Sequence, residues 1–154
     1  MTAPFPDDLT PSLAALADAV IPPSDVYGVP GAGDPAIVAL IVNDAGSRRG
    51  RLADAVRRLD HMAQDRFGDD FGALGPEDRQ AVVRAYREAH GAEADMAASL
   101  VAQSYYRDDR VMASLGLEPR PPHPKGYDVK QGDWSLLDPV RRRDRLYRET
   151  EHGG

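Results

Sequence analysis

The sequence predicts an all-α fold, a small bundle of about five helices followed by a long irregular arm rich in proline and glycine. Apolar residues recur at helical spacing over a body of about residues 9–115. No stretch shows the alternating pattern of a strand. The arm, about residues 116–148, has no helical period before a closing turn or two that starts at Pro139. At 154 residues, the chain fits a single domain.

Prolines mark the start of the first two helices and the end of the first. We expect the first to start with Thr10-Pro11 as N-cap and first helical position, and to end at Ile21 because Pro22-Pro23 follows. Asp34-Pro35 repeats the same start after a rigid loop. The second helix is apolar nearly all round and ends near residues 43–46, so we expect a short buried element.

The third helix, from about Ser47 to Phe67, has one apolar and one charged face. Gly68 can adopt the left-handed backbone conformation that commonly follows the last residue of a helix. Gly75-Pro76-Glu77 starts a fourth helix, which Gly91 interrupts. The fifth segment then runs to about Leu115. We expect a break in this fifth segment at Asp108-Asp109. In the loop between the third and fourth helices, we expect Phe71 and Leu74 to anchor the loop to the core.

Composition excludes several classes of chemistry and of location. Without cysteine the chain has no disulfide, thiolate metal site or thiol nucleophile of its own. The start has neither a basic nor an apolar signal region, and no run approaches the roughly 20 apolar residues of a membrane span. We therefore expect a cytoplasmic chain without direct membrane insertion, exported only if a partner carries the signal.

Charge is distributed unevenly along the chain. The net charge of −6 argues against nucleic-acid binding. Residues 1–47 contain six Asp and no Lys or Arg, whereas residues 120–148 carry eight Lys or Arg against four Asp. The two ends can pair within the fold or present separate patches to a partner.

No motif for catalysis stands out. His61 and Asp65 are four residues apart on the charged face of the third helix, where solvation among arginines is the simpler interpretation. His90 and Glu93 flank the Gly91 break, a position typical of helix caps. A metal-dependent enzyme that uses these four residues is the remote alternative. No metal or other cofactor is expected in this chain.

Large aromatic residues lie in or beside the arm. A structureless loop of more than about 12 to 15 residues is uncommon in a compact domain and is usually functional or disordered. This one holds Tyr127 and Trp134, and Tyr105 and Tyr106 precede it. Aromatic side chains are typical interface anchors, so we predict that these four residues bind a partner. The alternative is an arm that packs on its own helices.

Two stretches together resemble a known family. The first is LAALADAVIPPSDVYGVPGAGDPAIVALI, residues 13–41, and the second is SYYRDDRVMASLGLEPRPPHPKGYDVKQGDW, residues 104–134. The first stretch has a helix stop and a Gly/Pro loop, and the second has paired tyrosines, Asp-x-Arg-Val and Lys-Gly-Tyr. The joint order of these features is similar to the gluconate 2-dehydrogenase subunit 3 family. Neither stretch is a catalytic signature.

The resemblance implies a non-catalytic accessory subunit. Its partner would be an FAD-dependent oxidoreductase of the glucose–methanol–choline (GMC) type, which oxidises a sugar, sugar acid or glycoside. The small subunit would bind this partner, stabilise it and help it mature, while electrons pass to a cytochrome c subunit or another acceptor. Many members begin with a twin-arginine export signal, and here the recognisable domain starts at Leu9. The alternative function is an all-helical regulatory or scaffold module that binds another protein.

Overall fold

The computed structural model describes residues 4–121, 123, 125, 126 and 128–144. By its internal contacts the chain divides into two units, which we call the body unit, Met1–Pro119, and the arm unit, Arg120–Gly154. Each is described by itself. Among the described residues all regular secondary structure is helical, apart from one antiparallel bridge between Ser24 and Val29, which confirms the predicted all-α class.

The described residues of the body unit, 4–119, form five helices of at least 11 residues and one shorter helix. They are α1 (Thr10–Val20), α2 (Pro35–Ala45), α3 (Arg49–Phe67), α4 (Pro76–Ala89), α5 (Gly91–Tyr105) and α6 (Asp109–Ser114). Three 3-10 turns accompany them: η1 (Asp7–Leu9) before α1, η2 (Gly46–Arg48) between α2 and α3, and η3 (Phe71–Ala73) between α3 and α4. The described part of the arm unit contains η4 (Trp134–Leu137) and α7 (Asp138–Arg141).

Most predicted helix boundaries are confirmed. Asp34 caps α2, accepting a hydrogen bond from the Ala36 amide at 3.0 Å, and Gly68 ends α3 with a left-handed φ of +84°. α1 stops before the Pro22-Pro23 pair, with Ile21 as its C-cap. The prediction for Thr10 was wrong, because η1 runs directly into α1 and makes Thr10 its first residue.

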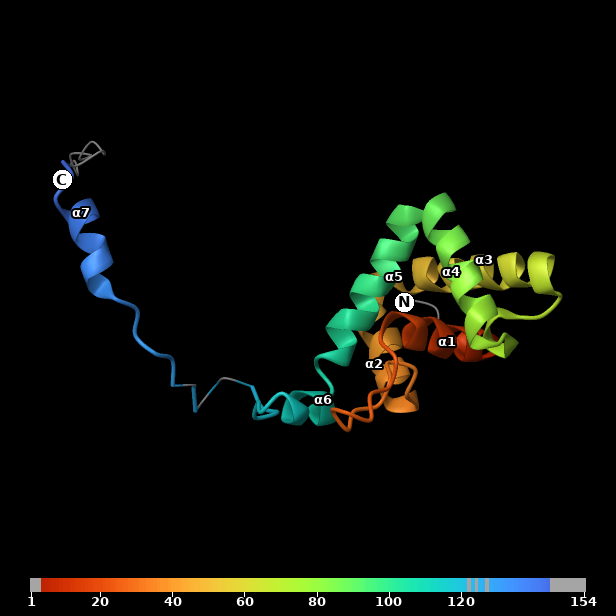
Figure 1. Ribbon diagram of the computed structural model, residues 1–154, viewed down its shortest axis with the longest axis horizontal. Coiled ribbons are helices and arrows are strands. Elements are labelled where there is room, and N and C mark those ends of the chain that lie inside the picture. Colours follow the sequence, from red (N-terminus) through yellow and green to blue (C-terminus); the bar gives the residue numbers. More distant parts are fainter. Residues whose placement is uncertain (1–3, 122, 124, 127, 145–154) are drawn as a thin grey trace, which may run out of the picture. The chain divides into compact units, whose positions relative to one another are not determined.

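The core is one cluster of apolar side chains from α1 to α6 and from the loops between them. α2 packs most extensively against α5, and α3 packs against α4 (Figure 1). The largest fully buried side chains are Tyr86, Phe71, Leu13, Ile37, Ile41, Leu52, Leu59 and Leu100. α2 is less enclosed than predicted, because Ala39 on its outer face is exposed.

A polar network holds η3 against three helices. Asp60 on α3 accepts hydrogen bonds from the Ser12 hydroxyl at 2.6 Å and from the Phe71 amide at 3.0 Å. The Arg79 guanidinium donates to the Gly72 carbonyl at 2.6 Å. Phe71 and Leu74 are both buried, as the sequence predicts for loop anchors.

The loop between α1 and α2 lies close against α1. The Gly33 amide donates to the Asp18 carboxylate at 2.7 Å. A Cβ atom on Gly33 would lie 2.6 Å from the Ala14 carbonyl oxygen, too close for any real side chain, and one on Gly31 would meet Asp18 and Pro23. These two glycines are needed for close packing.

Across the described residues, no helix has both the length and the apolar character needed to cross a membrane.

Replacing Gly33 by alanine is expected to lower the free energy of unfolding by about 1–3 kcal/mol, because the backbone of α1 cannot yield easily. Gly50 is the matched control, since nothing lies within 4 Å of its missing Cβ. Gly50→Ala in α3 should leave stability unchanged or raise it by up to about 1 kcal/mol. Urea denaturation measures both changes, and equal stabilities would contradict the packing argument.

Candidate partner interface

The two adjacent tyrosines at the end of α5 have different environments. Tyr105 is 4% exposed, whereas Tyr106, the C-cap of α5, is 56% exposed. Their rings meet edge to face with centroids 5.3 Å apart. Only Tyr106 therefore offers its ring to another molecule.

Tyr105 is engaged inside the body unit. Its hydroxyl donates to the Pro30 carbonyl in the α1–α2 loop at 3.1 Å. Burial raises the pKa of the Tyr105 phenol, with smaller contributions from Tyr106 and Asp108. The hydroxyl thus acts as a stable hydrogen-bond donor that fastens the loop to the end of α5.

The aromatic residues of the arm unit are only partly described. Trp134 opens η4, is 60% exposed and donates from its indole Nε1 to the Gln131 side-chain oxygen at 3.2 Å. Tyr127 lies outside the described residues. The exposed fraction of Trp134 is consistent with an anchor for a partner, and the role of all four predicted residues at an interface stays a prediction.

Further exposed apolar side chains accompany Trp134 in the described part of the arm unit. They are Val129, Leu136, Leu137 and Val140. Trp134, Leu137 and Val140 recur every three residues, the spacing of one side of a helical turn. This spacing can be read from the sequence, but the adjacent prolines and glycines indicate an irregular segment in which a helical turn is not expected.

A set of ion pairs and hydrogen bonds, which we call the α2 clamp, ties residues 104–110 to both ends of α2. At the start of α2, the Arg110 guanidinium donates two hydrogen bonds to Asp34, at 2.8 and 3.1 Å. It also donates two to Asp108, each at 3.0 Å. Arg110 thus neutralises two carboxylates that cap two different helices.

At the other end of α2, Asp44 completes the clamp. It accepts hydrogen bonds from the Arg107 guanidinium, 2.7 Å to each carboxylate oxygen, and from the Ser104 hydroxyl at 3.0 Å. Through Asp34 and Arg110, the clamp joins the two stretches of sequence that define the family resemblance. It also fixes the direction in which the chain leaves α5.

Arg110 lowers the pKa of two of the clamp's carboxyl groups. Hydrogen bonds from Arg110 hold the pKa of Asp34 and that of Asp108 below the ordinary value for aspartate, with burial opposing the shift. The same two carboxylates raise the pKa of Arg110. Asp34, Asp108 and Arg110 are consequently all charged at neutral pH.

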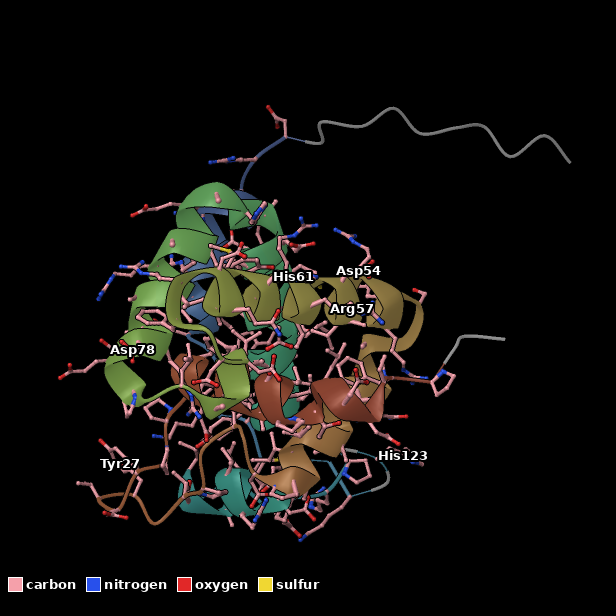
Figure 2. The ribbon with its side chains drawn as sticks, turned by 90° about the vertical axis from the view of Figure 1, so that its right-hand side faces the viewer. Tyr27, Asp54, Arg57, His61, Asp78 and His123 are labelled. Carbon is pink, nitrogen blue, oxygen red and sulfur yellow. The ribbon has the colours of Figure 1, made fainter. Side chains whose placement is uncertain are left out.

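Exposed apolar residues gather at the end of the body unit that the clamp holds. Val26 and Tyr27, at the tip of the α1–α2 loop, are 88% and 74% exposed. Leu115 and Leu117, after α6, are also exposed. Figure 2 shows Tyr27 on the loop that lies beside α6, and Figure 1 places this loop and α6 at the same end of the body unit.

The residues considered for a metal site do not assemble one. His61 and Asp65 lie on the exposed face of α3, as Figure 2 shows for His61. Glu93 accepts hydrogen bonds from the Tyr86 hydroxyl at 2.9 Å and from Arg58 at 3.0 Å. His90 packs its ring on Tyr86. In the part of the chain that the structure describes, no three His, Cys, Asp or Glu side chains are grouped to hold a metal ion.

The protein-family model for gluconate 2-dehydrogenase subunit 3 matches residues 9–116. The match covers the helices α1 to α6 and ends at Gly116, so the resemblance suggested for residues 117–134 lies outside it. No curated protein and no solved structure matches the chain significantly.

Arg110→Gln should lower the free energy of unfolding at pH 7 by about 1–2 kcal/mol, a modest value because Arg110 is half exposed. Asp34 and Asp108, the two carboxylates that Arg110 contacts, have a lowered pKa in the folded state. Their contribution is therefore present above the unfolded pKa of about 3.9 and is lost as pH falls through the folded values. Urea denaturation between pH 7 and pH 3 should show a larger acid loss for the wild type than for the variant.

The matched control is Arg57→Gln, which breaks the exposed pair of Arg57 and Asp54 on α3. It should change stability by no more than about 0.5 kcal/mol. Identical acid losses in the wild type and in Arg110→Gln would show that the clamp does not couple folding to protonation.

Proposed function

The chain belongs to the gluconate 2-dehydrogenase subunit 3 family, and from this premise we propose that it is a non-catalytic accessory subunit of an FAD-dependent oxidoreductase. Its partner is a GMC-type flavoprotein that oxidises a sugar, sugar acid or glycoside. The accessory chain binds the flavoprotein, stabilises it and helps it take up FAD. A cytochrome c subunit or another acceptor receives the electrons.

The family match over residues 9–116 is the observation that carries this proposal. It includes every helix of the body unit and the α2 clamp. The matched region is thus a complete folded body with one core, as expected of a subunit that folds and then binds.

The exposed side chains of the arm unit support a binding role. Trp134 and its apolar neighbours in η4 and α7 offer the kind of area that a partner's groove can bury. The basic residues Arg141, Arg142 and Arg143 follow directly and suit an acidic rim around that groove. The oxidation itself is assigned to the flavoprotein, which holds the FAD and the sugar.

Co-expression with any GMC-type flavoprotein whose gene neighbours that of this chain tests the proposal. We expect a complex that elutes together from size exclusion and carries the absorbance of bound flavin. Flavoprotein expressed without the accessory chain should contain less FAD per polypeptide. Separate elution of the two chains, with equal flavin content in both preparations, would contradict the accessory role.

Trp134→Ala is expected to weaken the complex by at least about 2 kcal/mol, or about 30-fold in Kd, if the indole is a buried anchor. The melting temperature of the isolated chain should stay unchanged, because Trp134 is largely exposed there. Val20→Ala, on α1 in the body unit, is the control and should bind normally. Titration calorimetry measures the affinities, and an unchanged Kd for Trp134→Ala would remove this residue from the interface.

A further inference from the structure

The body unit exposes its large apolar side chains at one end. Of the six described side chains of this kind, five belong to the α1–α2 loop or to the segment from the end of α5 to the end of the body unit. We call these five the corner surface: Val26, Tyr27, Tyr106, Leu115 and Leu117. The sixth, Val20, lies at the end of α1 and is only 36% exposed.

The corner surface is held in place before any partner arrives. Backbone hydrogen bonds between Ser24 and Val29 close the loop that presents Tyr27. The Tyr105 hydroxyl fixes the same loop at Pro30, and the α2 clamp holds α6. Binding to a preorganised surface loses little conformational entropy, and exposed tyrosines contribute large contact area with few rotatable bonds.

The chain itself connects this surface to the arm unit. Leu117 is followed after two residues by Arg120, the first residue of the arm unit. A partner that binds the arm unit is therefore tethered beside the corner surface at an effective concentration of about millimolar. At such concentrations even a weak apolar contact is populated.

The charged residues around the corner surface favour a different protein over a second copy of this chain as its binding partner. Asp25 and Asp109 lie exposed beside Tyr27 and at the start of α6. A second copy docked through the same surface would bring these carboxylates toward their own equivalents, which is unfavourable. A different protein with basic groups around an apolar patch avoids this repulsion.

We propose that the corner surface docks the same flavoprotein subunit that the arm unit binds, so that this chain holds its partner at two places. The inference rests on the proposed function. The body unit makes a rigid contact through Tyr27 and Tyr106, and the arm unit adds a second contact around Trp134. The flavoprotein presents an apolar patch with a basic rim to the corner surface.

The test uses the full chain with the co-expressed flavoprotein and four variants. Tyr27→Ser combined with Tyr106→Ser removes the corner anchors, Trp134→Ala removes the arm anchor, and the third variant combines all three changes. Val20→Ser is the control for an exposed apolar residue outside the corner surface. Kd is measured for each, and circular dichroism of the isolated chains reports folding.

The corner variant should bind at least about tenfold more weakly than the wild type. The combined variant should lose at least about 10²-fold, because both contacts of a two-point complex are gone. Val20→Ser should bind like the wild type. Val26→Asp, at the most exposed of the five positions, is an independent corner variant should the double tyrosine variant fold poorly.

Three results would overturn the inference. If the wild type binds and the corner variants bind equally well, the proposed function stands and the corner surface is not part of the interface. If the corner variants instead convert a dimer of the isolated chain to a monomer without affecting the flavoprotein, a second copy covers the surface. If the wild type does not bind the flavoprotein at all, both the proposed function and this inference fail.

Discussion

The bridge that the Arg110 guanidinium makes between two carboxylates is the constraint on which the arrangement of one end of the body unit depends. The guanidinium joins Asp34, which caps α2, and Asp108, which caps α6, two carboxylates that would repel each other without it. α6 has six residues, too few to be stable as an isolated helix, so its position comes from these contacts. Asp34 serves two purposes, because the same side chain accepts from the first turn of α2.

This arrangement links packing to binding. The clamp holds α2 and residues 104–110 together, and the α1–α2 loop is fastened to the same corner by Tyr105. The body unit ends at Pro119, five residues after α6, and the arm unit begins at Arg120. A rigid corner followed by an arm offers two separate surfaces for contact on a chain with a small core, which suits the dehydrogenase subunit that the family match indicates.

Part of the candidate interface was predictable from the sequence and part was not. The residue types were visible: paired tyrosines, a lone tryptophan and a proline-rich arm. The different environments of Tyr105 and Tyr106 were not, because adjacent residues on a helix point about 100° apart and only the docked loop decides which one is covered. Val26 and Tyr27 were passed over as loop residues, since nothing local shows that they stand at the tip of a closed loop.

The sequence by itself determined the all-α class and nearly every helix boundary, because N-caps, prolines and C-terminal glycines act over a few residues. Asp34 and Gly68 are examples, and Thr10 is an exception only because a 3-10 turn precedes it. Tertiary structure alone decided that Asp34 pairs with Arg110, 76 residues away, and that Gly33 must lack a side chain. These features depend on which surfaces pack together, and no pattern of short period along the chain contains that information.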